Sequence, residues 1–346
     1  MGAVRAWCRS QFSLLATIGM SALVVFVVAC SSDNSETAPP SATSVGSPTG
    51  SVSPTTGTPD TGGSPSGQEL PLIPATAGLE TLRQLVKDPN RDSLPDDQRI
   101  VEQIQWGYSI VTDTPTNAPQ YVGGSMSCTN CHLSSGQKDK GLPYIGISAM
   151  FPEYNPRNGT MRSLEDRIVD CFERSENAPE TPREDSPEVL AVATYITWLS
   201  EGAPTWENPS WRGQNRIAEE NLIPIDELDP AKGEQLYEQQ CASCHGADGQ
   251  GVLIGEVKAG PLWGDGSWND GAGAGRVYTL AGFIRWAMPY TTPGSLSDED
   301  AQQIAAFINS HDRPSFQGKD EDYPEVGPPV DAVYYPQRYP ENPLKR

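Results

Sequence analysis

Two copies of the pattern Cys-x-x-Cys-His are the residues best suited to chemistry in this 346-residue chain. They read Cys128-Thr-Asn-Cys131-His132 and Cys241-Ala-Ser-Cys244-His245. The spacing is that of a c-type haem attachment site, in which two thiols bond to the vinyl groups of one porphyrin and the adjacent imidazole coordinates its iron. A redox dithiol or half of a zinc site would explain a single copy. Two copies 113 residues apart favour two covalently bound haem c groups.

Histidine is scarce, and this limits how the two irons can be coordinated. The chain contains three histidines, of which two belong to the haem motifs and the third is His311. The second axial ligands must therefore come mostly from other residue types, and ligand identity sets the redox behaviour of a haem. The shortage also disfavours a dihaem peroxidase.

Met288 is the predicted second ligand of the haem attached through Cys241 and Cys244. It is the only methionine in the second half of the chain and is followed by Pro289, ahead of a predicted closing helix. Coordination by His245 and Met288 would raise the reduction potential and favour electron transfer. A methionine that only fills the core is the alternative.

Two proline-containing loops are expected to orient the haem-ligating histidines. In Gly260-Pro261-Leu262, the proline carbonyl is predicted to accept a hydrogen bond from the ring of His245. Gly141-Leu142-Pro143 is predicted to do the same for His132. Such a bond fixes the orientation of a ligating imidazole.

Cys171 is left over once the other six cysteines are assigned. Cys8 lies in a predicted signal peptide, Cys30 is a predicted lipidation site, and four cysteines hold haem. Cys171 therefore has no partner for an intramolecular disulfide. An odd cysteine in an oxidising compartment indicates a free, reactive thiol.

The residues around Cys171 predict a helix that begins at Ser163 with capping-box spacing. Arg167, Cys171 and Ser175 recur every four residues and share one face of it. A cation one turn from a thiol favours the thiolate, which is both a ligand for haem iron and a nucleophile. The neighbouring stripe, expected to face the core, consists of Leu164, Ile168 and Phe172.

A less reactive interpretation of Cys171 stays open at this point. Cys171 would then be a buried free cysteine beside a surface arginine. The second ligand of the first haem would be one of the three methionines of the first half, which are Met126, Met150 and Met161.

Residues 1–29 have the pattern of a bacterial signal peptide. Arg5 and Arg9 precede an interrupted apolar run that ends at Ala29, and Val27-Val-Ala-Cys30 resembles a lipobox in which Cys30 becomes lipidated. An ordinary secretory signal with an incidental Cys30 is the alternative. The interruptions argue against a permanent transmembrane helix.

Residues 30–70 are predicted to form a flexible tether, because they are mostly Ser, Thr, Pro and Gly and cannot build a core. The body would then be lipid-anchored at the outer face of the cytoplasmic membrane or in the periplasm. The formal charge is −21, or −23 once Arg5 and Arg9 leave with the signal. Such a negative charge excludes nucleic acid as a binding partner. It favours a basic redox partner, such as a small cytochrome c or a terminal oxidase.

The remaining chain is predicted to fold as two all-α, class I cytochrome c-like domains in tandem. The first covers residues 71–215, and the second covers residues 216–346 and includes a C-terminal extension. Each half shows a helix, a haem motif, a long loop and a closing helix. Helices are predicted after Ser186, over Ala231–Gln240 and from Ser297. The segment from Arg313 onward is expected to pack on the surface, with a disordered tail as the alternative.

The segment Leu164-Glu-Asp-Arg-Ile-Val-Asp-Cys-Phe-Glu-Arg-Ser175 resembles a helix of the dihaem, tetrathionate-forming thiosulfate dehydrogenases. The resemblance extends over residues 75–336, through the first haem motif, Tyr195-Ile-Thr-Trp-Leu-Ser200 and the Arg313–Pro324 segment. It implies that Cys171 ligates the first haem iron and reacts with substrate. It also implies that Arg157, Arg167 and Ser175 bind the thiosulfate anion.

The chain departs from the family pattern directly after Ser175. The family usually continues with Met-Asn-Gly, whereas this chain has Glu176-Asn-Ala178. Some relatives carry a lysine directly before the methionine of the second haem, where this chain has Ala287. Glu176 could weaken anion binding, and ligand switching by lysine is not expected.

These features predict an oxidoreductase that joins two thiosulfates into tetrathionate and passes the electrons through two haems to an external acceptor. The reverse reaction stays open. The alternatives are a dihaem electron carrier without chemistry of its own and a haem enzyme that acts on a sulfur-loaded carrier protein.

Overall fold

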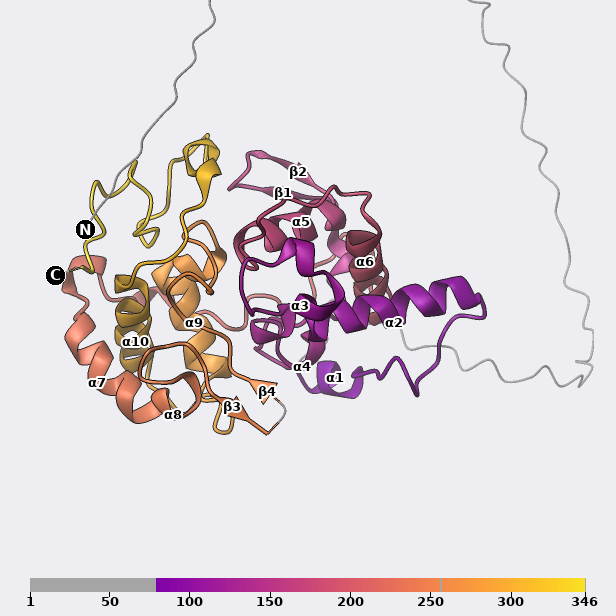
Figure 1. Ribbon diagram of the computed structural model, residues 1–346, viewed down its shortest axis with the longest axis horizontal. Coiled ribbons are helices and arrows are strands. Elements are labelled where there is room, and N and C mark those ends of the chain that lie inside the picture. The colour runs from indigo at the N-terminus through magenta and orange to yellow at the C-terminus, as the bar shows by residue number, and fades with distance from the viewer. Residues whose placement is uncertain (1–78, 256, 346) are drawn as a thin grey trace, which may run out of the picture. The chain divides into compact units, whose positions relative to one another are not determined.

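A computed structural model describes residues 79–255 and 257–345 (Figure 1). The predicted signal peptide, Cys30 and the tether lie outside the described residues. Helices dominate the described part, and its strands form two short antiparallel hairpins. Within the described ranges, no helix combines the length and the apolarity that a membrane span requires.

Six α-helices, one hairpin and short 3-10 helices make up the described part of the first half. The helices are α1 (Leu79–Gln84), α2 (Gln98–Thr112), α3 (Thr114–Asn117), α4 (Leu133–Gly136), α5 (Leu164–Arg174) and α6 (Pro187–Leu199). The hairpin pairs β1 (Glu153–Asn155) with β2 (Thr160–Arg162). Helix α2 packs along α6, and α5 packs against α6 from another side.

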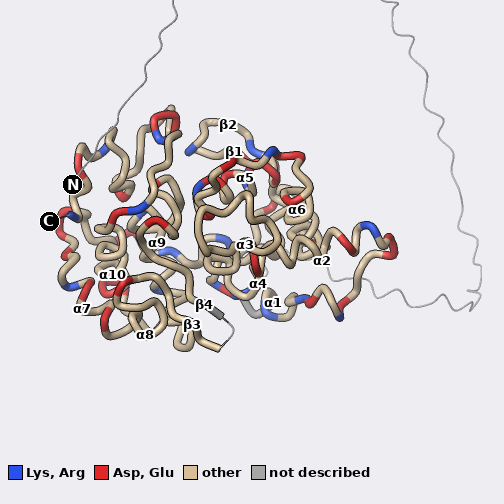
Figure 2. Tube along the Cα trace, viewed as in Figure 1, with Lys and Arg blue, Asp and Glu red and all other residues tan. Residues whose placement is uncertain are grey.

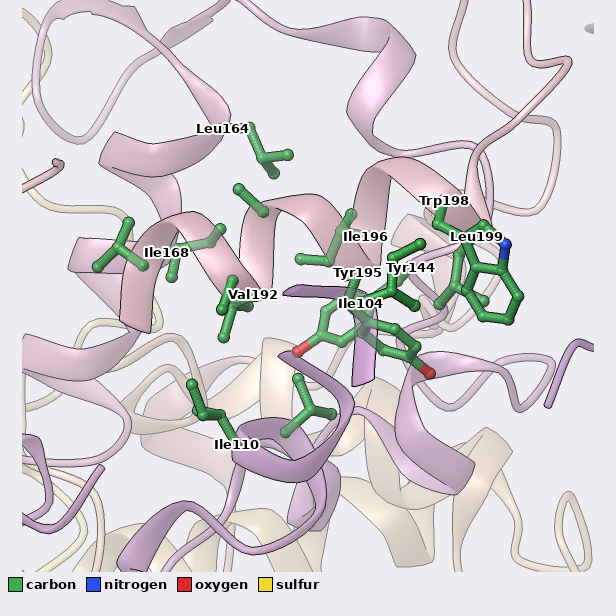
Figure 3. Close-up of a cluster of buried hydrophobic side chains, with 14 of the residues drawn as sticks. Ile104, Ile110, Tyr144, Leu164, Ile168, Val192, Tyr195, Ile196, Trp198 and Leu199 are labelled. Carbon is green, nitrogen blue, oxygen red and sulfur yellow. The ribbon is translucent and has the colours of Figure 1, made fainter. Parts of the chain in front are cut away.

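Figure 3 shows the core of this first half. Ile104 and Ile110 of α2 meet Val192 and Ile196 of α6, and Leu164 of α5 closes the cluster. The predicted inward stripe of α5 is confirmed, because its members are all buried: Leu164, Ile168 and Phe172.

Four α-helices, one hairpin and short 3-10 helices make up the described part of the second half. The helices are α7 (Pro230–Gln240), α8 (Ala242–His245), α9 (Val277–Ala287) and α10 (Asp298–Ser310). The hairpin pairs β3 (Leu253–Ile254) with β4 (Val257–Lys258). Helix α10 packs against both α7 and α9, and their buried faces form a second core.

The two halves use the same close crossing of a first helix and a closing helix. A Cβ atom added to Gly107 of α2 would lie 2.1 Å from the carbonyl oxygen of Ala191 in α6. A Cβ atom added to Gly233 of α7 would lie 2.0 Å from the carbonyl oxygen of Gln303 in α10. Only glycine permits this approach of two backbones.

Side-chain caps explain where several helices begin. Ser163 and Asp166 form a complete capping box at the start of α5, as the sequence predicts. Asp229 caps α7, and the Ser297 side chain accepts a hydrogen bond from the backbone N–H of Asp300 at the start of α10. Pro187 occupies the first turn of α6, where its missing N–H is not needed. The predicted helix starts are therefore confirmed.

The C-terminal segment is ordered up to residue 345 and packs on both halves, so the disordered-tail alternative is wrong. Asp322 forms an ion pair with Arg174 of α5. Asp331 forms an ion pair with Arg276, directly before α9. Acidic and basic positions are interspersed along both halves (Figure 2).

Candidate haem pockets and substrate site

His132 is held by a backbone carbonyl in the loop that follows α4. Its Nδ1 lies 2.7 Å from the carbonyl oxygen of Leu142. The acceptor is therefore Leu142, and the predicted role of Pro143 is wrong. Burial lowers the pKa of His132 to about 4, so the ring is neutral. A neutral ring that donates through Nδ1 leaves the Nε2 lone pair for a metal.

Tyr144 forms one wall of this pocket. Its ring stacks on the His132 ring, with centroids 4.3 Å apart and an interplanar angle of 27°. Its backbone N–H donates to the carbonyl of Gly136, which closes the loop at its base. Tyr144 also belongs to the first core, so the orientation of His132 is tied to that core.

His245 is held in the same way in the second half. Its Nδ1 lies 3.3 Å from the carbonyl oxygen of Gly260, one residue before the proline predicted to provide it. The predicted loop nevertheless provides the acceptor carbonyl. In both pockets this carbonyl belongs to the residue directly before a proline. Burial lowers the pKa of His245 as well, so this ring is also suited to coordinate a metal through Nε2.

The side chains of both motifs fit covalent haem attachment. Cys128, Cys131, Cys241 and Cys244 are all free of disulfides. Each pair is followed by an imidazole whose Nδ1 is already occupied by a carbonyl. Two free thiols and one available Nε2 are the donor set that a c-type haem needs.

Cys171 lies beside the first motif, in contact with a cation. Arg167 Nη1 donates to Cys171 Sγ at 3.2 Å, as the shared helix face predicts. Cys171 also interacts electrostatically with Cys128 and Cys131, and Arg167 interacts with His132. The structure therefore brings together the thiol, its cation and the first haem motif.

The three methionines considered as alternative ligands have other surroundings. Met161 is exposed on β2. Met126 packs in the second core, where its sulfur lies against Gly260. Met150 is buried and lines a pocket with Met161 and Trp206. Within the described residues, none of these methionines contacts Arg167 as Cys171 does, and the second ligand of the first haem stays a prediction.

Arg157 and Ser175 make contacts of their own. Arg157 Nη1 donates to the carbonyl oxygen of Gly271 at 3.3 Å. Burial acts to lower the pKa of Arg157, but Tyr323, Tyr335 and Asp322 together raise it above its ordinary value. Ser175 is the C-cap of α5, and its backbone N–H donates to the Cys171 carbonyl at 2.8 Å. Their anion-binding roles stay predictions.

Glu176 brings a buried carboxyl group into the first pocket. It is 4% exposed, and its Oε2 has no hydrogen-bond partner. Burial raises its pKa to about 8, against a smaller opposing effect of a hydrogen bond with Cys128. Glu176 also interacts electrostatically with Cys131 and Tyr144. The carboxyl is therefore neutral at neutral pH.

Met288 lies at the C-terminal end of α9, as its C-cap residue. The preceding residue, Ala287, is fully buried, and an alanine has no side-chain group that could ligate iron. Helix α9 itself was not anticipated from the sequence, although it is the element that delivers Met288.

Sequence analysis missed several residues that organise the site. The Tyr144 ring stacks on His132, and Gly271 accepts hydrogen bonds from both Arg157 and Arg174. The only available signal for Tyr144 was its place directly after the predicted loop. Gly271 acts through its backbone, which leaves no side-chain signal.

Comparison with known families matches both halves of the chain. Residues 121–205 match the SoxA/TsdA cytochrome c domain, and residues 228–308 match the family described as cytochrome C oxidase, cbb3-type, subunit III. The first range contains His132 and Cys171, and the second contains His245 and Met288. The predicted pair of cytochrome c domains is thereby confirmed, and such domains carry covalently bound haem c.

Two relatives extend the match over most of the body. A thiosulfate dehydrogenase of Stutzerimonas stutzeri is 43% identical over 62% of this chain and 68% of its own length. One of Allochromatium vinosum is 39% identical over 64% of this chain and 82% of its own length. The chain belongs to the thiosulfate dehydrogenase family. The predicted family resemblance is therefore confirmed.

A solved structure of the family has the same fold. It is the thiosulfate dehydrogenase (TsdBA) from Marichromatium purpuratum, with a TM-score of 0.60 and 34% sequence identity. The match covers 66% of this chain and 49% of that one, so this chain spans about half the length of its solved relative.

Proposed function

We propose that this member of the family oxidises two thiosulfate ions to one tetrathionate ion and releases two electrons. The observation that carries the proposal is the contact between Arg167 Nη1 and Cys171 Sγ, 3.2 Å apart beside the first haem motif. The family's curated members, which are named for this activity, support the substrate.

The arginines would bind the substrate against the overall negative charge of the protein. Thiosulfate is a dianion, and the formal charge of the chain is −21. Local cations are therefore required. Their charge-assisted hydrogen bonds hold the anion, which the net negative charge of the protein otherwise repels. Arg167 would orient one thiosulfate toward Cys171, with Arg157 and Ser175 completing the anion site.

Cys171 would carry the covalent step. Its thiolate forms a sulfur–sulfur bond with the sulfane sulfur of the first thiosulfate, and two electrons leave, which gives a Cys–S–S–SO3⁻ adduct. The sulfane sulfur of the second thiosulfate attacks the sulfane sulfur of this adduct, which is bonded to Cys171 Sγ, and the Sγ–S bond breaks. Tetrathionate departs and the Cys171 thiolate is regenerated, so atoms, charge and electrons balance.

Two haems, when bound, would accept these electrons singly and pass them to an external acceptor. Cys128, Cys131 and His132 would hold the first haem, with Cys171 as its second ligand. The thiols of Cys241 and Cys244 would attach the second haem, and His245 and Met288 would coordinate its iron. Thiolate ligation lowers a haem potential and His/Met ligation raises it, which favours electron flow from the first haem to the second. The reverse reaction uses the same groups.

The protein would act outside the cytoplasmic membrane. The signal-like residues 1–29, the lipobox cysteine Cys30 and the Ser/Thr/Pro/Gly-rich tether support a lipid-anchored location at the outer face of that membrane or in the periplasm. The acidic charge supports a basic electron acceptor, such as a small cytochrome c or a terminal oxidase.

The variant Cys171→Gly tests the enzyme mechanism. We expect thiosulfate-dependent reduction of an artificial acceptor to fall by at least about a thousandfold, because the nucleophile is removed. The first haem should also lose its thiolate-type low-spin EPR signal, while the His/Met signal stays. Unchanged turnover would exclude Cys171 as the nucleophile, and two His/Met signals in the parent protein would exclude it as an iron ligand. A parent protein that reduces no acceptor with thiosulfate would instead support a dihaem electron carrier.

A further inference from the structure

Two lysines from the first half of the chain lie against aromatic rings on both sides of Met288. Lys140 Nζ is 3.5 Å from the ring centroid of Trp286, two residues before Met288. Lys138 Nζ is 5.1 Å from the ring centroid of Tyr290, two residues after it. Both distances lie within the range at which an ammonium group is attracted to a ring face.

The Trp286 ring is fixed by further contacts. Its Nε1 donates to the carbonyl oxygen of Arg216 at 3.0 Å, and Arg285 Cζ lies 4.3 Å from its centroid. Partial burial lowers the pKa of Lys140, which is consistent with an ammonium group partly removed from water. Removal from water strengthens such a contact.

These lysines belong to the turn that holds His132. Lys140 has φ +57° and Leu142 has φ +54°, both in the left-handed region that non-glycine residues rarely adopt. The carbonyl of Leu142 is the acceptor for His132. Backbone in this region persists only when surrounding contacts hold it, and the rings of the second half supply such contacts.

The loop that holds His245 is contacted from the first half in turn. A Cβ atom added to Gly260 would lie 2.8 Å from Met126 Sδ and 3.1 Å from Asn130 Cγ. Gly260 provides the carbonyl that accepts the His245 hydrogen bond. Asn130 lies between the two cysteines of the first haem motif.

We propose that each haem pocket is completed by the other half of the chain. Lys138, Lys140, Trp286 and Tyr290 act as positioning residues, which couple the His132 acceptor loop to the Met288 segment. Contact of Asn130 with Gly260 provides the reciprocal coupling. A change in one pocket therefore alters the ligand geometry, and with it the reduction potential, of the haem in the other.

The test measures both midpoint potentials and both low-spin EPR signals in the haem-loaded protein. The haems are assigned with His132→Met and His245→Met, because each variant replaces an axial ligand of one haem and therefore changes the signal of that haem most. Trp286→Leu removes a ring of the second half without changing charge, and we expect it to shift the potential and the signal of the first haem. Lys140→Gln should shift the potential and the signal of the second haem. For each haem, the double variant Lys140→Gln/Trp286→Leu should show a shift in potential no greater than the larger of the two single-variant shifts.

Controls separate coupling from charge and from misfolding. Lys232→Gln removes the same charge from α7, where Lys232 is partly exposed and forms an ion pair with Glu299, and it should leave both signals unchanged. Tyr290→Leu alters an exposed ring, so it tests the coupling even if Trp286→Leu fails to fold. First-haem signals that stay unchanged in Trp286→Leu and Tyr290→Leu would overturn the proposal. Because the readout is a potential, this test stands whether or not thiosulfate is the substrate.

Discussion

Glu176 places a carboxyl group next to a site proposed to bind an anion. Burial raises its pKa to about 8, so the group is mostly protonated at neutral pH and becomes charged as the pH rises through 8. A carboxylate there would repel thiosulfate. We expect the KM for thiosulfate to increase on the order of tenfold between pH 7 and pH 9, beyond the change seen with a neutral side chain.

Glu176→Gln provides that neutral side chain. The KM of the Glu176→Gln variant for thiosulfate should not change as the pH rises through 8. Glu180 is exposed, so Glu180→Gln should keep the pH dependence of KM seen in the parent protein. Steady-state kinetics across the pH range measure both. A parental profile in Glu176→Gln would assign the pH dependence to another group.

Individual residues of the site could be predicted where counting was decisive. Three histidines for two haems, and one cysteine left over, were enough to single out Cys171 and Met288 as candidates. The contacts of the Arg157 side chain could not be predicted, because its partners Gly271 and Tyr323 are distant in the sequence. The choice of Leu142 and Gly260 as carbonyl acceptors likewise depends on backbone geometry that no side chain encodes.

At the scale of elements, the sequence predicted those helices that begin with an N-terminal capping residue. Helix α5 follows this rule, with its box of Ser163 and Asp166. Helix α9 has no side-chain cap bond and begins after Arg276, whose partner is Asp331 of the C-terminal segment. Its start therefore depends on a tertiary contact, which explains why local patterns missed it.

Ser163→Ala tests how far the cap positions the reactive helix. The Ser163 side chain accepts from the backbone N–H of Asp166 at 3.0 Å, and we expect its loss to cost about 1 kcal/mol of unfolding free energy. Ser163→Asp keeps a hydrogen-bond acceptor at this position, so its unfolding free energy should fall much less. Chemical denaturation of the haem-loaded protein, followed by circular dichroism, measures both. Equal losses for the two variants would show that the cap bond is not what stabilises α5.

At the scale of the whole molecule, the C-terminal segment joins the reactive helix to the second half. Arg174 of α5 forms two hydrogen bonds with Asp322, at 2.7 and 2.9 Å, and both side chains are buried. Tyr335 adds a hydrogen bond to the same carboxylate at 2.6 Å. The segment therefore holds the end of α5 that carries Ser175, and through Tyr323 it also contacts Arg157.

Arg174→Met should be strongly destabilising for this reason. Removal of one partner leaves the Asp322 carboxylate buried without its cation, which costs about 3–5 kcal/mol of unfolding free energy. The exposed Arg183→Met, whose partner Asp185 stays in water, should leave stability unchanged within error. In the double variant with Asp322→Leu, no unpaired carboxylate remains at position 322, so part of the loss should be recovered. If Arg174→Met unfolded at the same denaturant concentration as Arg183→Met, this ion pair could not be what fixes the C-terminal segment on α5.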